Sequence, residues 1–169
     1  MPRTISTSFR HQTQASFADD VDLIFATISH PDLSFPVRVV NDTIDYVYAS
    51  LNWTGFPFEI SILSDDESPP KAKISFQNVD QIIGQAVRDL ISAPRLKLEL
   101  LSSSDFNLDT RPRTPIGSPF VQYVADKLYL SNVTVDVLTV SSDIVGWDYL
   151  QRTWPGIRAT QGRLPGLFR

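Results

Sequence analysis

The sequence contains no cysteine. Without thiols, the chain has no disulfide framework, no thiolate nucleophile and no zinc or iron–sulfur site held by cysteine. Histidine is nearly as scarce, since His11 and His30 are the only two, and their separation along the chain does not match a metal-binding motif. We therefore expect a protein that holds neither a metal nor a cofactor.

The short motifs of common enzymes are also missing. The sequence has no serine-centred elbow, no glycine-rich phosphate loop and no metalloprotease helix. The acidic run at residues 65–67 lacks the spaced ligands of a calcium loop and is typical of a solvated turn, and His30 beside Pro31 is typical of a turn residue. A cell-wall hydrolase that pairs Glu59 with an aspartate stays open, because placing two carboxylates requires geometry. We expect no enzymatic activity.

Long apolar stretches are absent too. No window approaches the roughly 18 consecutive apolar residues of a membrane-spanning helix. The segment that begins Met1-Pro2-Arg3-Thr4 lacks the apolar core of a secretory signal. We expect a protein that has no membrane partner and is assembled in the cytoplasm.

Acidic and basic side chains are unevenly distributed. The net charge is −4, yet residues 151–169 contain four arginines and no acid, which leaves 11 basic and 19 acidic side chains in residues 1–150. The arginines alternate with apolar residues such as Trp154 and Ile157 instead of joining lysine runs, so the segment lacks the usual pattern of nucleic-acid binding. We expect no direct nucleic-acid recognition.

One stretch has a clear helical pattern. Apolar residues between Val79 and Ile91 recur at spacings of three and four, which places them on one face of a helix. Asn78 can cap the first turn, and Pro94 ends the helix. The pattern predicts an α-helix at about 79–92 that packs on a sheet. Its core-facing side chains are expected to be Ile82, Ile83, Val87 and Leu90.

Most of the remaining chain has strand patterns. Alternating apolar residues, β-branched residues and flanking turn residues delimit the segments. In Val21–Ile28 both alternating sets are apolar, which predicts a central strand with two buried faces. A weaker pattern at Ser6–Phe17 is compatible with a short helix. The predicted strands are Val21–Ile28, Phe35–Val40, Tyr46–Leu51, Phe56–Ile62, Ala72–Phe76, Leu96–Leu100, Phe120–Tyr123 and Lys127–Val140.

The fold class that follows is mainly β (α+β): an antiparallel β-sandwich or barrel with one packed α-helix at about 79–92 and an extended C-terminal arm. Residues 1–150 would form the β-rich domain and residues 151–169 the arm. The arm combines glycine and proline turns with side chains that fill pockets on a neighbour; the alternative is that it folds back on its own domain. The expected interface residues are Trp154, Ile157, Arg158, Arg163, Leu164, Pro165, Leu167 and Phe168.

Three aromatic residues suggest a different function. Tyr46, Tyr48 and Trp53 could stack on the apolar faces of sugar rings. This pattern predicts a carbohydrate-binding β-sandwich module that recognises a host surface. The alternative is that these side chains pack in the core or at an interface.

A series of short motifs extends over most of the chain. It comprises His30-Pro31-Asp32-Leu33, residues 36–42 (PVRVVND), residues 56–60 (FPFEI), Pro69-Pro70, Asn78-Val79-Asp80 and residues 164–168 (LPGLF). In order and spacing the series resembles the DUF1833 family of phage proteins. The stretch Ser103–Thr114 departs from the family's pattern.

The resemblance implies a minor tail component of a long-tailed phage, located in the virion. Such a protein would be a structural part of the tail tip or baseplate, forming a homo-oligomeric ring that joins the tail tube or distal tail protein to the hub and receptor-binding proteins. The implied partners are the distal tail protein, the hub and the end of the tape-measure protein. Resemblance and residue patterns together predict a structural protein.

Overall fold

A computed structural model describes residues 6–15, 20–61, 71–77, 90, 92–136, 138–146 and 162–163. The predicted helix at about 79–92 lies outside these residues except for Leu90 and Ser92, and the predicted arm lies outside them except for Gly162 and Arg163. The described elements are, in chain order, α1 (Thr7–Gln14), β1 (Asp22–Ser29), β2 (Val37–Val40), β3 (Tyr46–Tyr48), β4 (Leu51–Gly55), β5 (Phe58–Ile60), β6 (Lys71–Gln77), β7 (Arg95–Ser102), the 3₁₀ helix η1 (Ser103–Asp105), β8 (Phe106–Asn107), β9 (Thr114–Pro115), β10 (Tyr123–Val135) and β11 (Thr139–Gly146).

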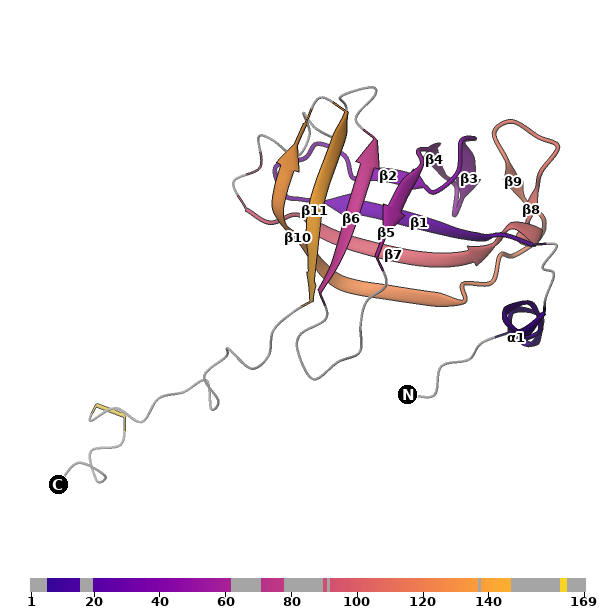
Figure 1. Ribbon diagram of the computed structural model, residues 1–169, viewed down its shortest axis with the longest axis horizontal. Helices are drawn as coiled ribbons and strands as arrows, with labels where there is room; N and C mark the ends of the chain where they lie inside the picture. Colours follow the sequence, from indigo (N-terminus) through magenta and orange to yellow (C-terminus); the bar gives the residue numbers. More distant parts are fainter. Residues whose placement is uncertain are drawn as a thin grey trace.

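The prediction of a mainly β fold is confirmed (Figure 1). In the described part of the chain, nine strands form one sheet in the order β3-β4-β2-β1-β7-β10-β11-β6-β5, and β8 and β9 form a small separate hairpin. Neighbouring strands of the large sheet are antiparallel, except that β2 and β4 run parallel. β1 lies inside the sheet and pairs along its whole length with β7.

The sheet curls until its two sides meet at the corner between β4 and β5. β4 pairs with β2, and after Phe56 and Pro57 the same stretch of chain continues as β5 and pairs with β6. At this corner the N–H of Phe56 donates to the carbonyl oxygen of Val40 (2.9 Å), and the N–H of Phe58 donates to Oδ1 of Asn41 (3.3 Å). The sheet is therefore a barrel that β4 and β5 close as one bent strand.

Alternate side chains of the barrel strands point inward and form the main core. This follows from the two-residue period of a strand, which sends every second side chain to the same face. Its buried members are Ala26, Ile28, Val39, Phe58, Ala72, Ile74, Phe76, Leu96, Leu98, Ala125, Leu128, Leu130, Val140 and Ile144. Leu90 is half-buried and packs against this core.

A second apolar cluster lies on the outer side of β1. Leu23 and Phe25 belong to it, whereas Ile24 and Ala26 face the main core, so both faces of β1 are buried as predicted. The ring of Phe25 meets those of Tyr46 and Trp53 edge to face, with centroid distances of 5.7 and 5.0 Å. Such pairs add about 0.5–1.5 kcal/mol beyond their burial. The buried members of this outer cluster are Leu23, Phe25, Val40, Tyr46, Trp53, Leu101 and Phe106.

The predicted strand Tyr46–Leu51 is wrong, because the chain turns back within it. Ala49 and Ser50 have φ angles of 53° and 61°, as both central positions of a type I′ hairpin turn require. β3 therefore ends at Tyr48, and β4 returns antiparallel to it. Asn and Gly normally mark this turn, so Ala-Ser gave no signal for it.

The predicted strand Lys127–Val140 is wrong for a similar reason. β10 ends at Val135 and β11 begins at Thr139, and the N–H of Asp136 donates to the carbonyl oxygen of Thr139 (2.8 Å) across the turn. Apolar residues recur closely through this turn, which contains no glycine or proline. This pattern therefore concealed both the turn and the greater part of β11.

One side of the barrel wall is longer than the other. β11 ends at Gly146, opposite Leu128 of β10. β10, in contrast, begins at Tyr123, and β7 beside it continues to Ser102, opposite Asp22 of β1. Figure 1 shows β1, β7 and β10 extending past β5, β6 and β11. We call this the extended end.

Candidate functional site

The extended end carries a group of exposed apolar side chains, which we call the end patch. Surface side chains of this size mark protein contacts when they gather in one place. The five residues of the end patch are Val21 (65% exposed), Ile116 (63%), Phe120 (44%), Tyr123 (37%) and Val124 (46%).

Backbone contacts with the end of β7 and the following η1 bring the end patch together. Val21 donates its N–H to Oγ of Ser103 (2.8 Å) and accepts the N–H of Ser103 on its carbonyl oxygen (2.9 Å). Ile116 donates its N–H to the carbonyl oxygen of Asp105 (2.8 Å), and Phe120 donates its N–H to Oδ2 of the same residue (3.1 Å). Tyr123 and Val124 lie in β10 where it pairs with β7. Segments far apart in sequence thus meet at this end of the barrel, with Tyr123 and Val124 on opposite faces of the sheet margin.

The segments that build the end patch are acidic. Residues 20–24, 99–106 and 116–124 contain Asp20, Asp22, Glu99 and Asp105 but no lysine, arginine or histidine. Glu99 accepts a hydrogen bond from Nζ of Lys97 (2.9 Å). Burial and, second, the negative charge of Asp20 raise the pKa of Asp22. A cation bound nearby would stabilise the charged form of Asp22.

The N-terminal helix α1 is attached beside the end patch. The side-chain amide of Gln122 donates to Oγ of Ser6 (2.8 Å), and Oε1 of Gln122 accepts the backbone N–H of Ser6 (3.2 Å). Because Gln122 immediately precedes Tyr123, these two hydrogen bonds hold the start of α1 at the extended end, where Figure 1 shows the helix.

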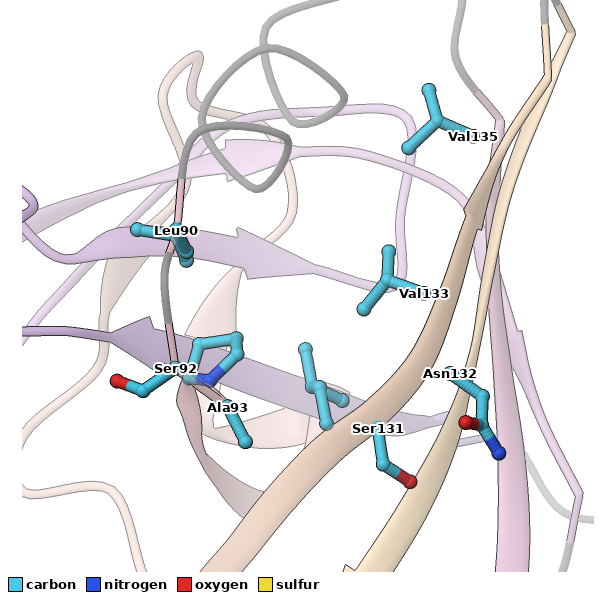
Figure 2. A pocket seen from close by; sticks show the side chains of 9 residues that line it. Leu90, Ser92, Ala93, Ser131, Asn132, Val133 and Val135 are labelled. Atoms are coloured by element: carbon cyan, nitrogen blue, oxygen red, sulfur yellow. The ribbon is translucent and has the colours of Figure 1, made fainter.

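A pocket of about 500 Å³ opens at the opposite end of the barrel (Figure 2). One wall is the segment that precedes β7, and the other is the second half of β10. A bulge between Ser131 and Thr134, with Asn132 at a φ of 51°, shifts the register of β10 against β11 at this point. The pocket is lined by Leu90, Ser92, Ala93, Pro94, Leu130, Ser131, Asn132, Val133 and Val135.

Ser92 at the rim of this pocket lies in a Ser-His-Asp arrangement. Nε2 of His30 is 2.5 Å from Oγ of Ser92, and Nδ1 of His30 is 3.5 Å from Oδ2 of Asp32. The backbone N–H of Asp32 donates to Nδ1 at 3.1 Å, so the proton of the neutral ring is assigned to Nε2, which donates to Ser92. A serine hydrolase needs the opposite tautomer, with Nε2 free to accept the serine proton.

These contacts instead hold the turn after β1 against the segment before β7. The N–H of Leu33 donates to the carbonyl oxygen of His30 (3.1 Å) and closes the turn. The prediction that His30 is a turn residue is confirmed.

A half-buried polar group ties the loop around Arg113 to the barrel. The hydroxyl of Tyr46 donates to Oδ2 of Asp42 (2.6 Å), and Nη1 of Arg113 donates both to the same carboxylate oxygen and to the Tyr46 hydroxyl (2.5 Å). The backbone N–H of Val47 donates to the carbonyl oxygen of Arg113 (2.8 Å). The backbone N–H of Arg113 donates to the carbonyl oxygen of Asp45 (2.8 Å).

The pKa values in this group follow from these contacts. Burial and, second, the hydrogen bond to Asp42 raise the pKa of Tyr46 to about 12. Burial acts to raise the pKa of Asp42, but the hydrogen bonds from Tyr46 and Thr43 and the charge of Arg113 together outweigh it and lower that pKa. The group therefore consists of a carboxylate, a guanidinium and a neutral phenol. It fixes the loop in place.

With the geometry in hand, comparison with known proteins assigns the chain to a family. A family model described as a domain of unknown function (DUF1833) matches residues 8–159. The chain belongs to the DUF1833 family. The region shared with other DUF1833 members thus includes the barrel and the end patch, whereas residues 160–169, with the LPGLF motif, lie beyond the match. No curated protein matches this DUF1833 chain.

The predicted sugar-binding face of this DUF1833 chain is wrong as far as Tyr46 and Trp53 are concerned. Both side chains are buried in the outer cluster, at 0% and 3% exposure. The indole Nε1–H of Trp53 donates to the carbonyl oxygen of Tyr48 (3.2 Å). A buried ring has no face on which a sugar could stack. The alternative, that these residues pack in the core, is confirmed by their burial.

The predicted interface residues fall almost wholly outside the described residues of the DUF1833 chain. Trp154, Ile157, Arg158, Leu164, Pro165, Leu167 and Phe168 lie there, and Arg163 is described as exposed. The acidic run 65–67 also lies outside, and Glu59 is exposed on β5. Within the described residues, no three histidine, aspartate or glutamate side chains gather as metal ligands would, and no helix is long and apolar enough to cross a membrane.

Proposed function

We propose that this DUF1833 chain is a structural component of the tail tip or baseplate of a long-tailed phage. Its copies would form a ring that joins the tail tube or distal tail protein to the hub and receptor-binding proteins, with the end of the tape-measure protein as a further partner. The end patch is the observation that carries the proposal.

The end patch has the composition of a protein-binding surface. It places one tyrosine, one phenylalanine and three β-branched residues at the extended end, two of them in β10 and three in the adjoining loops. Aromatic side chains are enriched in the centres of protein interfaces, and charged residues surround them. Here Asp20, Asp22 and Asp105 supply the charged surroundings. This combination favours a docking partner with apolar anchors and positive charge.

The barrel suits a structural role because its paired strands are hydrogen-bonded around the circumference. An open sheet edge would be a site for uncontrolled pairing with other chains. At the edge of β5, the N–H of Phe58 donates to Oδ1 of Asn41. At the edge of β3, the N–H of Val47 donates to the carbonyl oxygen of Arg113. Specific contacts between copies would then come from side chains on the end patch and from the arm.

A carbohydrate-binding module was the alternative for this sequence. The burial of Tyr46 and Trp53 removes the aromatic face on which that alternative depended. We therefore retain the structural proposal alone.

The proposal can be tested by substitution at the end patch in a phage that encodes this chain. We expect Phe120→Asp combined with Val124→Asp to leave the purified protein folded but to stop tail assembly, because two charges replace apolar contact side chains. Leu138→Asp is the matched control, since Leu138 is 75% exposed at the far end of the barrel. Tails that assemble normally with the double substitution would refute the proposal.

A further inference from the structure

We propose that the end patch is the receptor for the C-terminal arm, residues 151–169, of a second copy of the chain. The inference rests on the proposed ring and identifies the surface on which consecutive copies meet. The end patch and the arm belong to one sequence. They carry opposite charge, and both contain apolar side chains.

Charge is the first reason. The arm contains Arg152, Arg158, Arg163 and Arg169 and no acid. The three segments that build the end patch contain four acids and no base. Such complementarity steers two surfaces together and fixes their orientation. Burial and, second, the charge of Asp20 raise the pKa of Asp22, and an arginine placed beside this carboxyl group would favour its charged form.

Shape and apolar character are the second reason. Tyr123 and Val124 are neighbours in β10 and point to opposite faces of the sheet, as successive strand residues do. Phe120 and Ile116 extend the apolar surface onto the loop that contacts Asp105. A margin of this kind suits a partner segment whose apolar anchors, such as Trp154, are separated along the chain. A partner with a flat surface would suit it less well. The glycines and prolines of the arm allow it to bend around such a margin.

Symmetry is the third reason, because a contact with a second copy could build the proposed ring. Each copy offers one arm and one end patch, which are two different surfaces. A contact between two different surfaces on two copies is heterologous, and repeated contacts of this type form a ring where the rotation between copies closes. The segment after Gly146 spans residues 147–169, which at roughly 3.3–3.6 Å per residue would extend at most about 80 Å.

The absence of cysteine in the native sequence permits a direct test with the full-length chain. We would prepare Val124→Cys in the end patch and Leu167→Cys in the arm as two separately tagged proteins, and mix them at high concentration under mild oxidation. The expected result is a disulfide-linked heterodimer. Leu138→Cys mixed with Leu167→Cys is the matched control and should give at least tenfold less product.

Two results would overturn the inference. One is equal crosslinking of Leu167→Cys to positions 124 and 138, or none to position 124. The second result concerns a single chain that carries both Val124→Cys and Leu167→Cys and is oxidised at low concentration. If it forms an internal disulfide and stays a monomer, the arm binds its own barrel.

A charge reversal separates specific docking from chance collision. Asp22→Lys with Asp105→Lys should lower the heterodimer yield severalfold, and Arg158→Glu with Arg163→Glu in the arm partner should restore it. No restoration would contradict the assigned charge pairing. If tails require the end patch in the phage experiment while no crosslink forms at position 124, the receptor assignment fails and the proposed function stands.

Discussion

The N–H of Phe56 donates a 2.9 Å hydrogen bond to the carbonyl oxygen of Val40, and this contact lies where the sheet closes on itself. Just before it, Gly55 pairs with Val40 as the last residue of β4. Gly55 also donates its N–H to Oδ1 of Asp45 at 2.8 Å. The chain therefore passes from one side of the barrel to the other through a tightly packed corner, and the residues of this corner control whether the barrel forms.

Gly55→Ala should destabilise the protein strongly. A Cβ at this position would overlap the carbonyl group of Ile44 and lie 2.6 Å from its backbone nitrogen, so the corner would have to move. Overpacking of this kind costs about 1–3 kcal/mol or more, measurable as a lower midpoint in urea unfolding. Gly117→Ala is the control, because a Cβ there meets nothing within 4 Å and the strain comes only from its φ of +81°. An effect of Gly55→Ala no larger than that of Gly117→Ala would show that the corner is loosely packed.

Alkaline unfolding should depend on Tyr46. The pKa of Tyr46 is raised to about 12 by burial and by Asp42, from about 10 in an unfolded chain. Because the folded protein holds this proton more tightly, the stabilisation is fully present below pH 10 and is lost as the pH rises towards 12. Tyr46→Phe should therefore lose less stability than the wild type between pH 10 and 12. Identical slopes in that window would contradict the assignment.

The hairpin turn between β3 and β4 should accept a stabilising replacement. Ala49 and Ser50 occupy left-handed conformations that cost roughly 1 kcal/mol for residues other than glycine, asparagine and aspartate. Ala49→Asn with Ser50→Gly supplies the residues that this turn favours, and we expect the thermal midpoint to rise. Ser118→Gly, at an exposed bend without a positive φ, should leave the midpoint equal or lower. A fall in midpoint for the turn variant would mean that the turn is not of this type.

The neutral imidazole ring of His30 should be the tautomer that carries its proton on Nε2. The hydrogen bonds to Ser92 and from the N–H of Asp32 fix this tautomer, and nitrogen NMR of the ring can detect it directly. With this tautomer Ser92 is not activated as a nucleophile, so a fluorophosphonate probe should leave it unlabelled. Labelling that disappears in Ser92→Ala would reveal a hydrolase and refute the structural interpretation of this group.

The sequence patterns predicted the barrel strands well where apolar residues alternate over a long segment. β1 is the clearest case, because two apolar faces on Leu23–Ile28 require burial on both sides of the sheet. The patterns failed where a turn lacks glycine, asparagine or proline. Ala49-Ser50 turns the chain by backbone conformation alone, and the turn at Asp136 lies among closely spaced β-branched residues. Tertiary packing determines such turns.

The end patch could not be predicted from the sequence for a different reason. Val21 lies far along the chain from Ile116 and Phe120, and only the pairing of β1 with β7 and the contacts of Asp105 bring them together. In the sequence Val21 stands alone between two aspartates, and Ile116 and Phe120 lie in a short stretch rich in proline and glycine. The aromatic residues Tyr46 and Trp53 were conspicuous in the sequence, yet their side chains on the β3–β4 hairpin are buried in the outer cluster. The fold decides which side chains are exposed. The aromatic residues that stood out in the sequence are buried, and the inconspicuous residues of the end patch are exposed.

The most direct test of the central claim is to delete residues 153–169 and to measure tail assembly and the thermal midpoint of the purified barrel side by side. If the arm docks on a neighbouring subunit, truncated protein should unfold at the same temperature as the full-length chain while tails fail to assemble. A truncated protein that loses stability as a monomer, or that still supports complete tails, would contradict the claim that the arm joins one copy to the next.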